Sequence, residues 1–240
     1  MCHNPKLFFH KIDGLYLDSN YQIISEADAK RMCLQYGKVI LKPSINSCSG
    51  SGIIVYDCNV NDSDELSSFL RSKPSFVCQE YLHQSSFMST FCSSCVNTIR
   101  IITILFQGEI HVTTSVLIMG GEGAGTNHLH RGGIVCGIHQ DGRLFSVGFD
   151  RDLNEYTRHP FGVVFDNCVI PNYYKVLNLV KQVAPRLGHI SKMIAWDIAF
   201  DEKDEPVLIE TNLTWGGSVQ IAAGPVFGDM TKDILDTIIK

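Results

Sequence analysis

Two acidic side chains near the end of the chain stand where strand pairing would bring them together. The stretches Met193 to Phe200 and Val207 to Asn212 are apolar and rich in β-branched residues, and the short polar connection between them predicts an antiparallel hairpin. If the last residue of the first run, Phe200, pairs with the first residue of the second, Asp197 lies directly opposite Glu210. Because opposed like charges destabilise a sheet, this pairing indicates a cation between the two carboxylates.

A third oxygen ligand follows from the alternation of side chains along a strand. Asn212 lies two residues after Glu210 and therefore on the same face. Asp197, Glu210 and Asn212 together would suit a hard divalent cation such as Mg²⁺. The alternative is a surface hairpin with solvated acids, and a slip of one residue in the register would separate the pair.

An arginine lies within an apolar strand. Arg100 is flanked by isoleucines at 99, 101 and 102, and a guanidinium in a buried strand needs an anionic partner. A structural salt bridge is one explanation. The other is a fork that binds a transferring phosphate or a developing acyl phosphate.

A lysine ends a predicted strand beside a loop of small residues. Lys42 precedes the serine- and glycine-rich stretch 44–52, whose backbone N–H groups could approach phosphate closely. A strand is expected after this loop, at 53–56, which argues against a P-loop or a Rossmann turn because both need a helix there. A surface lysine beside a hairpin loop is the alternative. The candidate loop contacts are Ser49, Gly50, Ser51 and Gly52.

Two further segments carry polar groups at element ends. The extended backbone of Gln79, Glu80, Tyr81 and Leu82 could offer hydrogen bonds to an adenine edge while Leu82 covers its face, or could be a simple strand end. Later in the chain, Asn127 and Arg131 are candidates for contact with substrate or phosphate. A metal role for His128 and His130 is the weaker interpretation, since such a pair in a loop is usually a surface feature.

Composition indicates an ordinary globular protein. The 240 residues are 45% hydrophobic and 19% charged with a formal net charge of -5, and no basic patch suggests nucleic-acid binding. No apolar run approaches the roughly 20 residues that span a bilayer, and the first residues lack a signal-peptide pattern, so a cytoplasmic location is expected. The nine cysteines are mostly isolated, and the one C-x-x-C pair, Cys92 and Cys95, is interpreted as buried thiols on a helix.

The predicted strands and helices follow one another in a regular order along the chain. Strands alternate with helices in the first third, whereas long strands dominate from residue 97. We expect strands at 7–9, 14–17, 38–42, 53–56, 76–82, 98–106, 109–119, 134–139, 144–149, 193–200 and 207–212, and helices at 25–37, 62–72, 85–92, 171–187 and 229–239. The only plausible subdomain boundary lies around 83–89.

Taken together, the motifs resemble the ATP-grasp superfamily, most closely its branch associated with sugar transfer and polysaccharide biosynthesis. The paired strands with Asp197, Glu210 and Asn212 resemble the magnesium strands of that family. Segment 39–43 with its loop resembles the phosphate-binding lysine strand, 79–82 the adenine linker, 97–100 the arginine strand, and 127–133 an N-x-x-x-x-G-G segment. The resemblance covers nearly the whole chain in order.

The resemblance implies an α+β ATP-grasp fold with ATP between two lobes, a small lobe at 21–83 and a mainly antiparallel large lobe at 84–240. Residues 1–20 would be a remnant of an N-terminal lobe, with a partner or another segment supplying the rest. Lys42 would contact the α- and β-phosphates and Arg100 the γ-phosphate, with Mg²⁺ on the carboxylates. The implied reaction is ATP-dependent ligation of a carboxylate to an amine, with an amino acid and a sugar or cell-surface precursor as substrates. The alternatives are phosphotransfer to a sugar or hydroxyl, and a nucleotide-binding module without turnover.

Overall fold

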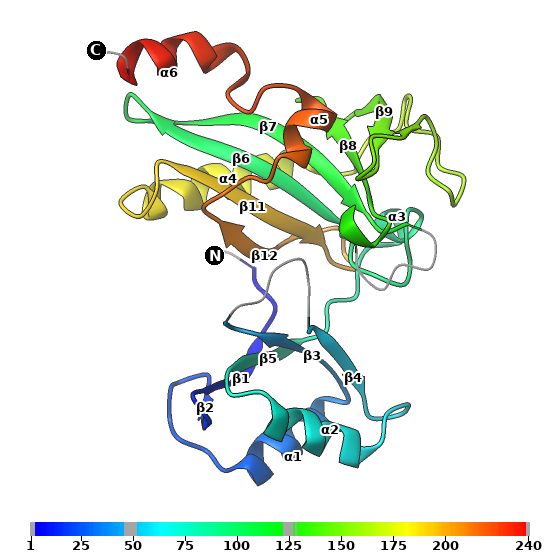
Figure 1. Ribbon diagram of the computed structural model, residues 1–240, viewed down its shortest axis with the longest axis vertical. Coiled ribbons are helices and arrows are strands. Elements are labelled where there is room, and N and C mark those ends of the chain that lie inside the picture. Colours follow the sequence, from blue (N-terminus) through cyan, green and yellow to red (C-terminus); the bar gives the residue numbers. More distant parts are fainter. Residues whose placement is uncertain (1–2, 46–51, 122–126, 128, 239–240) are drawn as a thin grey trace. The chain divides into compact units, whose positions relative to one another are not determined.

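The computed structural model describes residues 3–45, 52–121, 127 and 129–238 of the chain. These residues form two compact units (Figure 1). The smaller unit is Pro5–Leu82, and the larger one is His83–Lys240 together with Met1–Asn4. Each unit has its own sheet and its own hydrophobic core, as expected when a chain divides into separately packed bodies.

The smaller unit is a five-stranded antiparallel sheet packed against two helices. Its strand order is β2-β1-β5-β3-β4. The strands are β1 Leu7–Ile12, β2 Leu15–Asp18, β3 Lys38–Pro43, β4 Ile54–Asp57 and β5 Phe76–Glu80, and the helices are α1 Glu26–Tyr36 and α2 Ser63–Ser72. Strands β1 and β2, within the stretch that the resemblance assigned to a remnant lobe, are hydrogen-bonded into this sheet.

Side-chain caps fix where the two helices of this unit begin. A capping box fixes the start of α1: the Asp28 backbone N–H donates to Ser25 Oγ at 3.1 Å, and the Ser25 N–H donates to Asp28 Oδ2 at 3.2 Å. Gly37, with φ +74°, ends the helix. Asp62 caps α2 by accepting from the Asp64 N–H. The short polar side chains thus set the boundaries that the sequence predicts.

The larger unit is a seven-stranded antiparallel sheet in the order β10-β9-β8-β7-β6-β11-β12. Its long central strands β6 Thr98–Phe106 and β7 Glu109–Met119 have the predicted bounds. The remaining strands are β8 Ile134–Ile138, β9 Leu144–Phe149, β10 Glu155–Tyr156, β11 Met193–Phe200 and β12 Pro206–Asn212. The helices are α3 Ser86–Ser89, α4 Tyr173–Leu187, α5 Ser218–Ala223 and α6 Thr231–Ile238, with 3₁₀ turns η1 Leu129–Arg131 and η2 Gly228–Met230. Helix α5 and strand β10 were not predicted.

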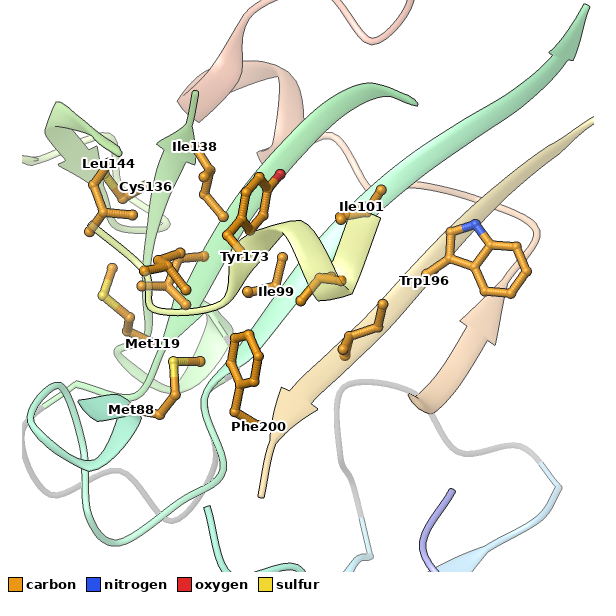
Figure 2. Packing of buried hydrophobic residues seen from close by; sticks show 14 of the residues in the cluster. Met88, Ile99, Ile101, Met119, Cys136, Ile138, Leu144, Tyr173, Trp196 and Phe200 are labelled. Carbon is orange, nitrogen blue, oxygen red and sulfur yellow. The ribbon is translucent and has the colours of Figure 1, made fainter. Parts of the chain in front are cut away.

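Helices cover both faces of this sheet (Figure 1). On one face, α4 packs on β6, β7 and β11, and Figure 2 shows Tyr173 of α4 in the same cluster as Ile99 and Ile138. On the other face, Val219 and Ala222 of α5 lie in a second cluster, with residues of the central strands. Because the strands are covered on both sides, their apolar residues do not alternate strictly with polar ones. The expected α+β class is confirmed.

The hairpin of β11 and β12 contains a bulge that the sequence did not predict. Asp197 pairs with Glu210, as predicted, but Phe200 pairs with Pro206 and Val207 pairs with Ala199, so the predicted Phe200–Val207 pairing is wrong. The register shifts between Asp197 and Ile198, which leaves one extra residue on β12. The bulge therefore preserves the carboxylate pairing despite a turn one residue shorter than expected.

Among the residues that the structure describes, no helix is long and apolar enough to cross a membrane.

Candidate functional site

Three charged residues lie in one row across three neighbouring strands of the larger unit. Arg100 on β6 pairs with Asp197 on β11, and Asp197 in turn pairs with Glu210 on β12. Residues at paired positions project from the same face of a sheet, so the row brings a guanidinium and two carboxylates together. The sequence predicted the two carboxylates to face each other but placed Arg100 only by its strand.

Arg100 and Asp197 form a two-pronged ion pair. Arg100 Nε donates to Asp197 Oδ1 at 2.7 Å, and Nη2 donates to Oδ2 at 2.6 Å. The Arg100 side chain is 19% exposed and the Asp197 side chain 8%, so the pair is largely removed from water. The structural salt bridge, one of the two explanations for Arg100, is therefore present, and it occupies one edge of the guanidinium fork.

A backbone carbonyl adds a further contact to this arginine. Arg100 Nη1 donates to the carbonyl oxygen of Trp215 at 3.3 Å. Burial acts to lower the pKa of Arg100, but the hydrogen bonds and charge of Asp197 and the charge of Glu210 raise that pKa above its ordinary value. An arginine has five N–H donors, and these contacts use three of them. The guanidinium thus stays charged and retains donors that can bind an anion.

Asn212 joins the two carboxylates. Its Nδ2 donates to Asp197 Oδ2 at 3.3 Å and to Glu210 Oε1 at 3.1 Å, so the amide lies on the same face as the acids, as the alternation predicted. Burial raises the pKa of Glu210, and the hydrogen bond and charge of Asp197 raise it further. The Asn212 hydrogen bond and the charge of Arg100 lower it, and the net direction is upward. Glu210 therefore carries a charge that its surroundings do not fully compensate.

This donor set fits a hard cation. Within the described part of the chain, no group of three or more His, Cys, Asp or Glu side chains could hold a metal ion. The predicted site uses two carboxylates and an amide; the carboxylate oxygens are ligands of the kind that Mg²⁺ takes, and the amide of Asn212 would supply its oxygen only by turning its Nδ2 away from the two acids. Arg100 neutralises only one of the two acids, so the row has an excess of one negative charge.

Asn127 and Arg131 have different surroundings. Asn127 Nδ2 donates to Thr98 Oγ1 at 2.7 Å and to the Ile118 carbonyl at 3.4 Å, so it anchors its segment to β6 and β7. Arg131 is exposed at the end of η1. Contact of either residue with substrate stays a prediction, while His128 lies outside the described residues.

The predicted lysine and part of its loop lie in the smaller unit. Lys42 is on β3, paired with Val77 of β5, and Val77 pairs with His10 of β1, so all three share one face of that sheet. Ser49, Gly50 and Ser51 lie outside the described residues. Gly52 has φ +75°, and a Cβ on it would lie 3.0 Å from Pro43 Cγ. Only glycine suits this return of the chain toward β4.

His10 is a polar residue of this face that the sequence did not single out. It is 6% exposed, its ring lies 4.5 Å from that of Tyr21, and its Nε2 is buried without a hydrogen-bond partner among the described residues. Period-2 alternation from Phe9 in the core would have placed it on the face opposite the helices. Lys11, by contrast, is directed to the helix side, where its Nζ donates to the Leu70 carbonyl at 2.7 Å.

The predicted adenine segment is divided by the end of β5. Gln79 and Glu80 lie within the strand: Gln79 pairs with β1 and β3, Glu80 pairs with β3, and the Glu80 N–H donates to the Lys6 carbonyl at 2.8 Å. Tyr81 and Leu82 follow the strand, and Lys38 Nζ lies 4.1 Å from the Tyr81 ring centroid. Contact of any of these four residues with a base stays a prediction.

Comparison with known proteins agrees with this arrangement. The family described as sugar-transfer associated ATP-grasp matches residues 4–235. The chain belongs to this family. A comparison with curated proteins finds no match.

Solved structures show that the chain has the ATP-grasp fold. D-alanyl-alanine synthetase A from Vibrio cholerae O1 biovar eltor str. N16961 is 11% identical with a TM-score of 0.56, over 99% of this chain and 60% of that one. The ATP-grasp ligase PsnB, complexed with precursor peptide PsnA2 and AMPPNP, is 11% identical with a TM-score of 0.51, over 100% and 55%. N5-carboxyaminoimidazole synthetase from Staphylococcus aureus, complexed with ADP, is 11% identical with a TM-score of 0.51, over 90% and 42%. This ATP-grasp chain thus spans 42 to 60% of the length of these three proteins.

Trp215 is the residue of this ATP-grasp chain's site that sequence reasoning missed most clearly. It contributes through its backbone carbonyl, and its ring packs at 6.5 Å from that of Phe227. The next residue, Gly216, has φ +78°, and a Cβ there would lie 3.5 Å from Arg100 Nη1. The Trp-Gly-Gly sequence after β12 was the available signal, because consecutive glycines indicate a close backbone approach.

Proposed function

We propose that this ATP-grasp chain is an ATP- and Mg²⁺-dependent ligase that activates a carboxylate as an acyl phosphate for attack by an amine. Support comes from its family, from the ligases that share its fold, and above all from the charged row on β6, β11 and β12. The family description links such proteins to sugar transfer, so we assign the substrates to an amino acid and a sugar-derived or cell-surface precursor.

The observation that carries the proposal is the uneven charge of the row Arg100, Asp197 and Glu210. A purely structural ion pair needs one carboxylate for one guanidinium. Here a second carboxylate is held beside the first by strand pairing, and Asn212 donates to both acids. An ionised Glu210 with a raised pKa lowers the stability of the fold unless a cation compensates its charge. The paired carboxylates are therefore better explained by metal and phosphate binding than by folding alone.

In the proposed reaction, an oxygen of the substrate carboxylate attacks the γ-phosphorus of ATP. The bond from the γ-phosphorus to the bridging oxygen breaks, ADP leaves with that electron pair, and an acyl phosphate forms. Lys42 contacts the α- and β-phosphates, and the uncommitted N–H donors of Arg100 bind the oxygens of the transferring group. Both cations would stabilise negative charge that moves during the transfer.

The second half-reaction needs no covalent bond to the protein. The amine attacks the acyl carbon, the carbon–oxygen bond to phosphate breaks, and inorganic phosphate leaves as the amide forms and the amine nitrogen loses a proton. Arg100 serves this step too, because the leaving phosphate carries the charge that the guanidinium already binds.

Asp197, Glu210 and Asn212 would hold the magnesium. Bound there, Mg²⁺ would neutralise charge on the β- and γ-phosphate oxygens. Asp197 can pair with Arg100 and bind magnesium at the same time, since a carboxylate has about four acceptor sites and the ion pair with Arg100 uses two of them. The phosphates would be contacted by the loop residues Ser49, Gly50, Ser51 and Gly52. The adenine would be contacted by the segment Gln79, Glu80, Tyr81 and Leu82.

Trapping with hydroxylamine tests the proposal without knowledge of the natural amine. Purified protein is incubated with Mg²⁺, ATP and hydroxylamine, together with panels of amino acids and of sugar carboxylates. We expect a hydroxamate and stoichiometric ADP for at least one carboxylate, because hydroxylamine attacks an acyl phosphate. The Glu210→Gln variant is the matched control and should give neither product.

The other outcomes separate the alternative functions. ADP release with a phosphorylated sugar or hydroxyl compound, and no hydroxamate, would replace the ligase with a phosphotransferase. Tight binding of Mg²⁺ and ATP without turnover on any substrate class would indicate a nucleotide-binding module. Either result would contradict the ligase proposal while leaving the site assignment in place.

A further inference from the structure

Two cysteines in the larger unit approach each other closely at a surface turn. Cys92 and Cys95 follow α3, and their Sγ atoms lie 3.3 Å apart, with the Cys95 thiol donating to Cys92. The two serines between them are exposed, whereas the cysteines are 0% and 7% exposed. The sulfurs therefore lie directly beneath a surface turn whose two serines face the solvent. The expectation of buried thiols is met, but the C-x-x-C segment lies after the helix and not on it.

The two thiols differ in their surroundings. Burial raises the pKa of Cys92, but hydrogen bonds from Ser94 and Cys95 lower it, and the net shift is downward. Ser94 Oγ lies 3.2 Å from Cys92 Sγ. Burial, with the hydrogen bond to Cys92, raises the pKa of Cys95. Cys92 is thus suited to be the nucleophile, and Cys95 to be its resolving partner.

The fold makes room for the sulfurs by means of a glycine. A Cβ on Gly120 would lie 2.3 Å from Cys95 Sγ and 2.9 Å from Cys92 Sγ, so no other residue fits there without moving both thiols. The Gly120 N–H donates to Asn97 Oδ1 at 3.0 Å, and its carbonyl lies 2.9 Å from Nε2 of the buried His159. The backbone beside the sulfurs is held on both sides.

The turn itself is held through its carbonyl groups. Gln84 Nε2 donates to the carbonyls of Cys92 and Cys95 at 2.6 and 2.8 Å, and Asn97 Nδ2 donates to the Cys92 carbonyl at 2.9 Å. These buried contacts keep the two sulfurs on the same side of the turn. A disulfide needs the sulfurs to approach to about 2.05 Å, which rotation of the two side chains can supply while these backbone contacts persist.

We propose that Cys92 and Cys95 form a redox-active dithiol, which hydrogen peroxide converts to an intramolecular disulfide. The Cys92 thiolate attacks a peroxide oxygen, the O–O bond breaks, and Cys92 becomes a sulfenic acid as the other oxygen leaves as water. Cys95 then attacks the Cys92 sulfur, the S–O bond breaks, and a second water leaves. Two thiols are oxidised and one peroxide is reduced, so the step balances.

Another close pair of cysteines shows why proximity alone is not the argument. Cys33 of α1 and Cys78 of β5 lie in the core of the smaller unit with their Sγ atoms 3.8 Å apart. Both are 0% exposed, and the hydrogen bond to Cys33, with burial, raises the pKa of Cys78. This pair lacks both the surface turn and the activated thiol, and it provides an internal control.

Peroxide titration followed by mass spectrometry tests the proposal on the full chain without any nucleotide. Reduced protein is treated with increasing hydrogen peroxide, alkylated with N-ethylmaleimide and digested with chymotrypsin, which cuts after Phe91 and so separates Cys92 and Cys95 from Cys78. We expect the Cys92–Cys95 peptide to lose two hydrogens and both alkylation sites, while Cys33 and Cys78 remain alkylated. Exposed Cys58 reports that peroxide is active.

Single variants identify the order of events. Cys95→Ser should trap a sulfenic acid on Cys92 that reacts with dimedone, whereas Cys92→Ser should leave Cys95 as a thiol at the same peroxide concentration. If the wild-type peptide keeps both alkylated thiols at a dose that oxidises Cys58, the proposal fails. It also fails if Cys33 and Cys78 form a disulfide as rapidly. Neither result bears on ligase activity, which is measured separately.

Discussion

Arg100 and Asp197 occupy paired positions on β6 and β11 and are joined by two hydrogen bonds of 2.7 and 2.6 Å. This ion pair changes the interpretation of the hairpin beside it. Opposed carboxylates were expected to require a cation, but a guanidinium already compensates Asp197. The requirement therefore falls on Glu210, because the side-chain hydrogen bonds of Arg100 within the row go to Asp197 and the charge of Arg100 only partly offsets the raised pKa of Glu210. That acid is the most informative position at which to test the site.

Replacing Glu210 with Gln should abolish Mg²⁺-dependent nucleotide binding and leave the fold intact. The substitution keeps the size of the side chain but removes the charge that attracts the metal. Titration of a fluorescent ATP analogue with and without Mg²⁺ measures the effect, and circular dichroism checks the fold. Glu202→Gln, at an exposed position of the β11–β12 connection, is the matched control and should bind as the wild type does. Unchanged affinity in Glu210→Gln would remove the metal assignment.

The same residue predicts how stability depends on pH. Because the folded state raises the pKa of Glu210, it binds more protons than the unfolded state between the ordinary Glu value of about 4.3 and the raised one. The contribution of Glu210 to stability is thus present below that ordinary value and is lost as pH rises through the raised pKa. Without metal, urea unfolding should show Glu210→Gln gaining stability over wild type as pH increases. A constant difference across this window would contradict the pKa direction.

Breaking the ion pair on one side should destabilise the larger unit. Asp197→Asn leaves a buried arginine without its charge partner, and we expect a loss of about 3 kcal/mol. Arg100→Met should cost a similar amount. Urea midpoints measure each variant, and the double variant should lose less than the sum of the two, with a coupling of about 1 kcal/mol or more. Strict additivity would show that the pair is not formed in solution.

A glycine substitution tests the packing around the dithiol. Gly120→Ala should cost about 1–3 kcal/mol, because the added Cβ would meet Cys95 Sγ at 2.3 Å. Gly217→Ala is the control: nothing lies within 4 Å of a Cβ there, and its φ of -61° suits alanine. Thermal denaturation of the reduced proteins compares the two. Equal midpoints would show that the sulfurs do not occupy the space beside Gly120.

Much of the fold follows from local sequence signals. The long strands of the larger unit were placed by their β-branched runs, and the bounds of β6 and β7 were predicted without error. The Ser25 cap identified the start of α1, and the predicted start of α2 at Asp62 is the residue that caps it. Helix α5 was missed because it is short and follows a Gly-Gly pair that the sequence analysis left unassigned.

The site was predicted less completely, for three physical reasons. The facing of Asp197 and Glu210 was predicted from a Phe200–Val207 pairing that is wrong, and it holds because of a bulge, which cannot be read from residue types. The partner of Arg100 depends on which strand lies beside β6, and β11 is distant along the chain. The sequence required an anion near Arg100 but did not identify Asp197. The Trp215 contact is made by a backbone atom, so its signal lay in the glycines that follow and not in the tryptophan itself.

Calorimetric titration of ATP into wild-type protein and the Lys42→Ala variant, each with and without Mg²⁺, tests the central claim most directly. The account predicts magnesium-dependent binding by the wild type that falls at least tenfold in affinity in Lys42→Ala, because an ammonium that contacts phosphate is lost. Lys73→Ala, on the exposed surface of the same unit, should bind normally. Binding that is equal in wild type and Lys42→Ala, or that does not depend on Mg²⁺, would contradict the assignment of this chain as a Mg²⁺- and ATP-dependent enzyme.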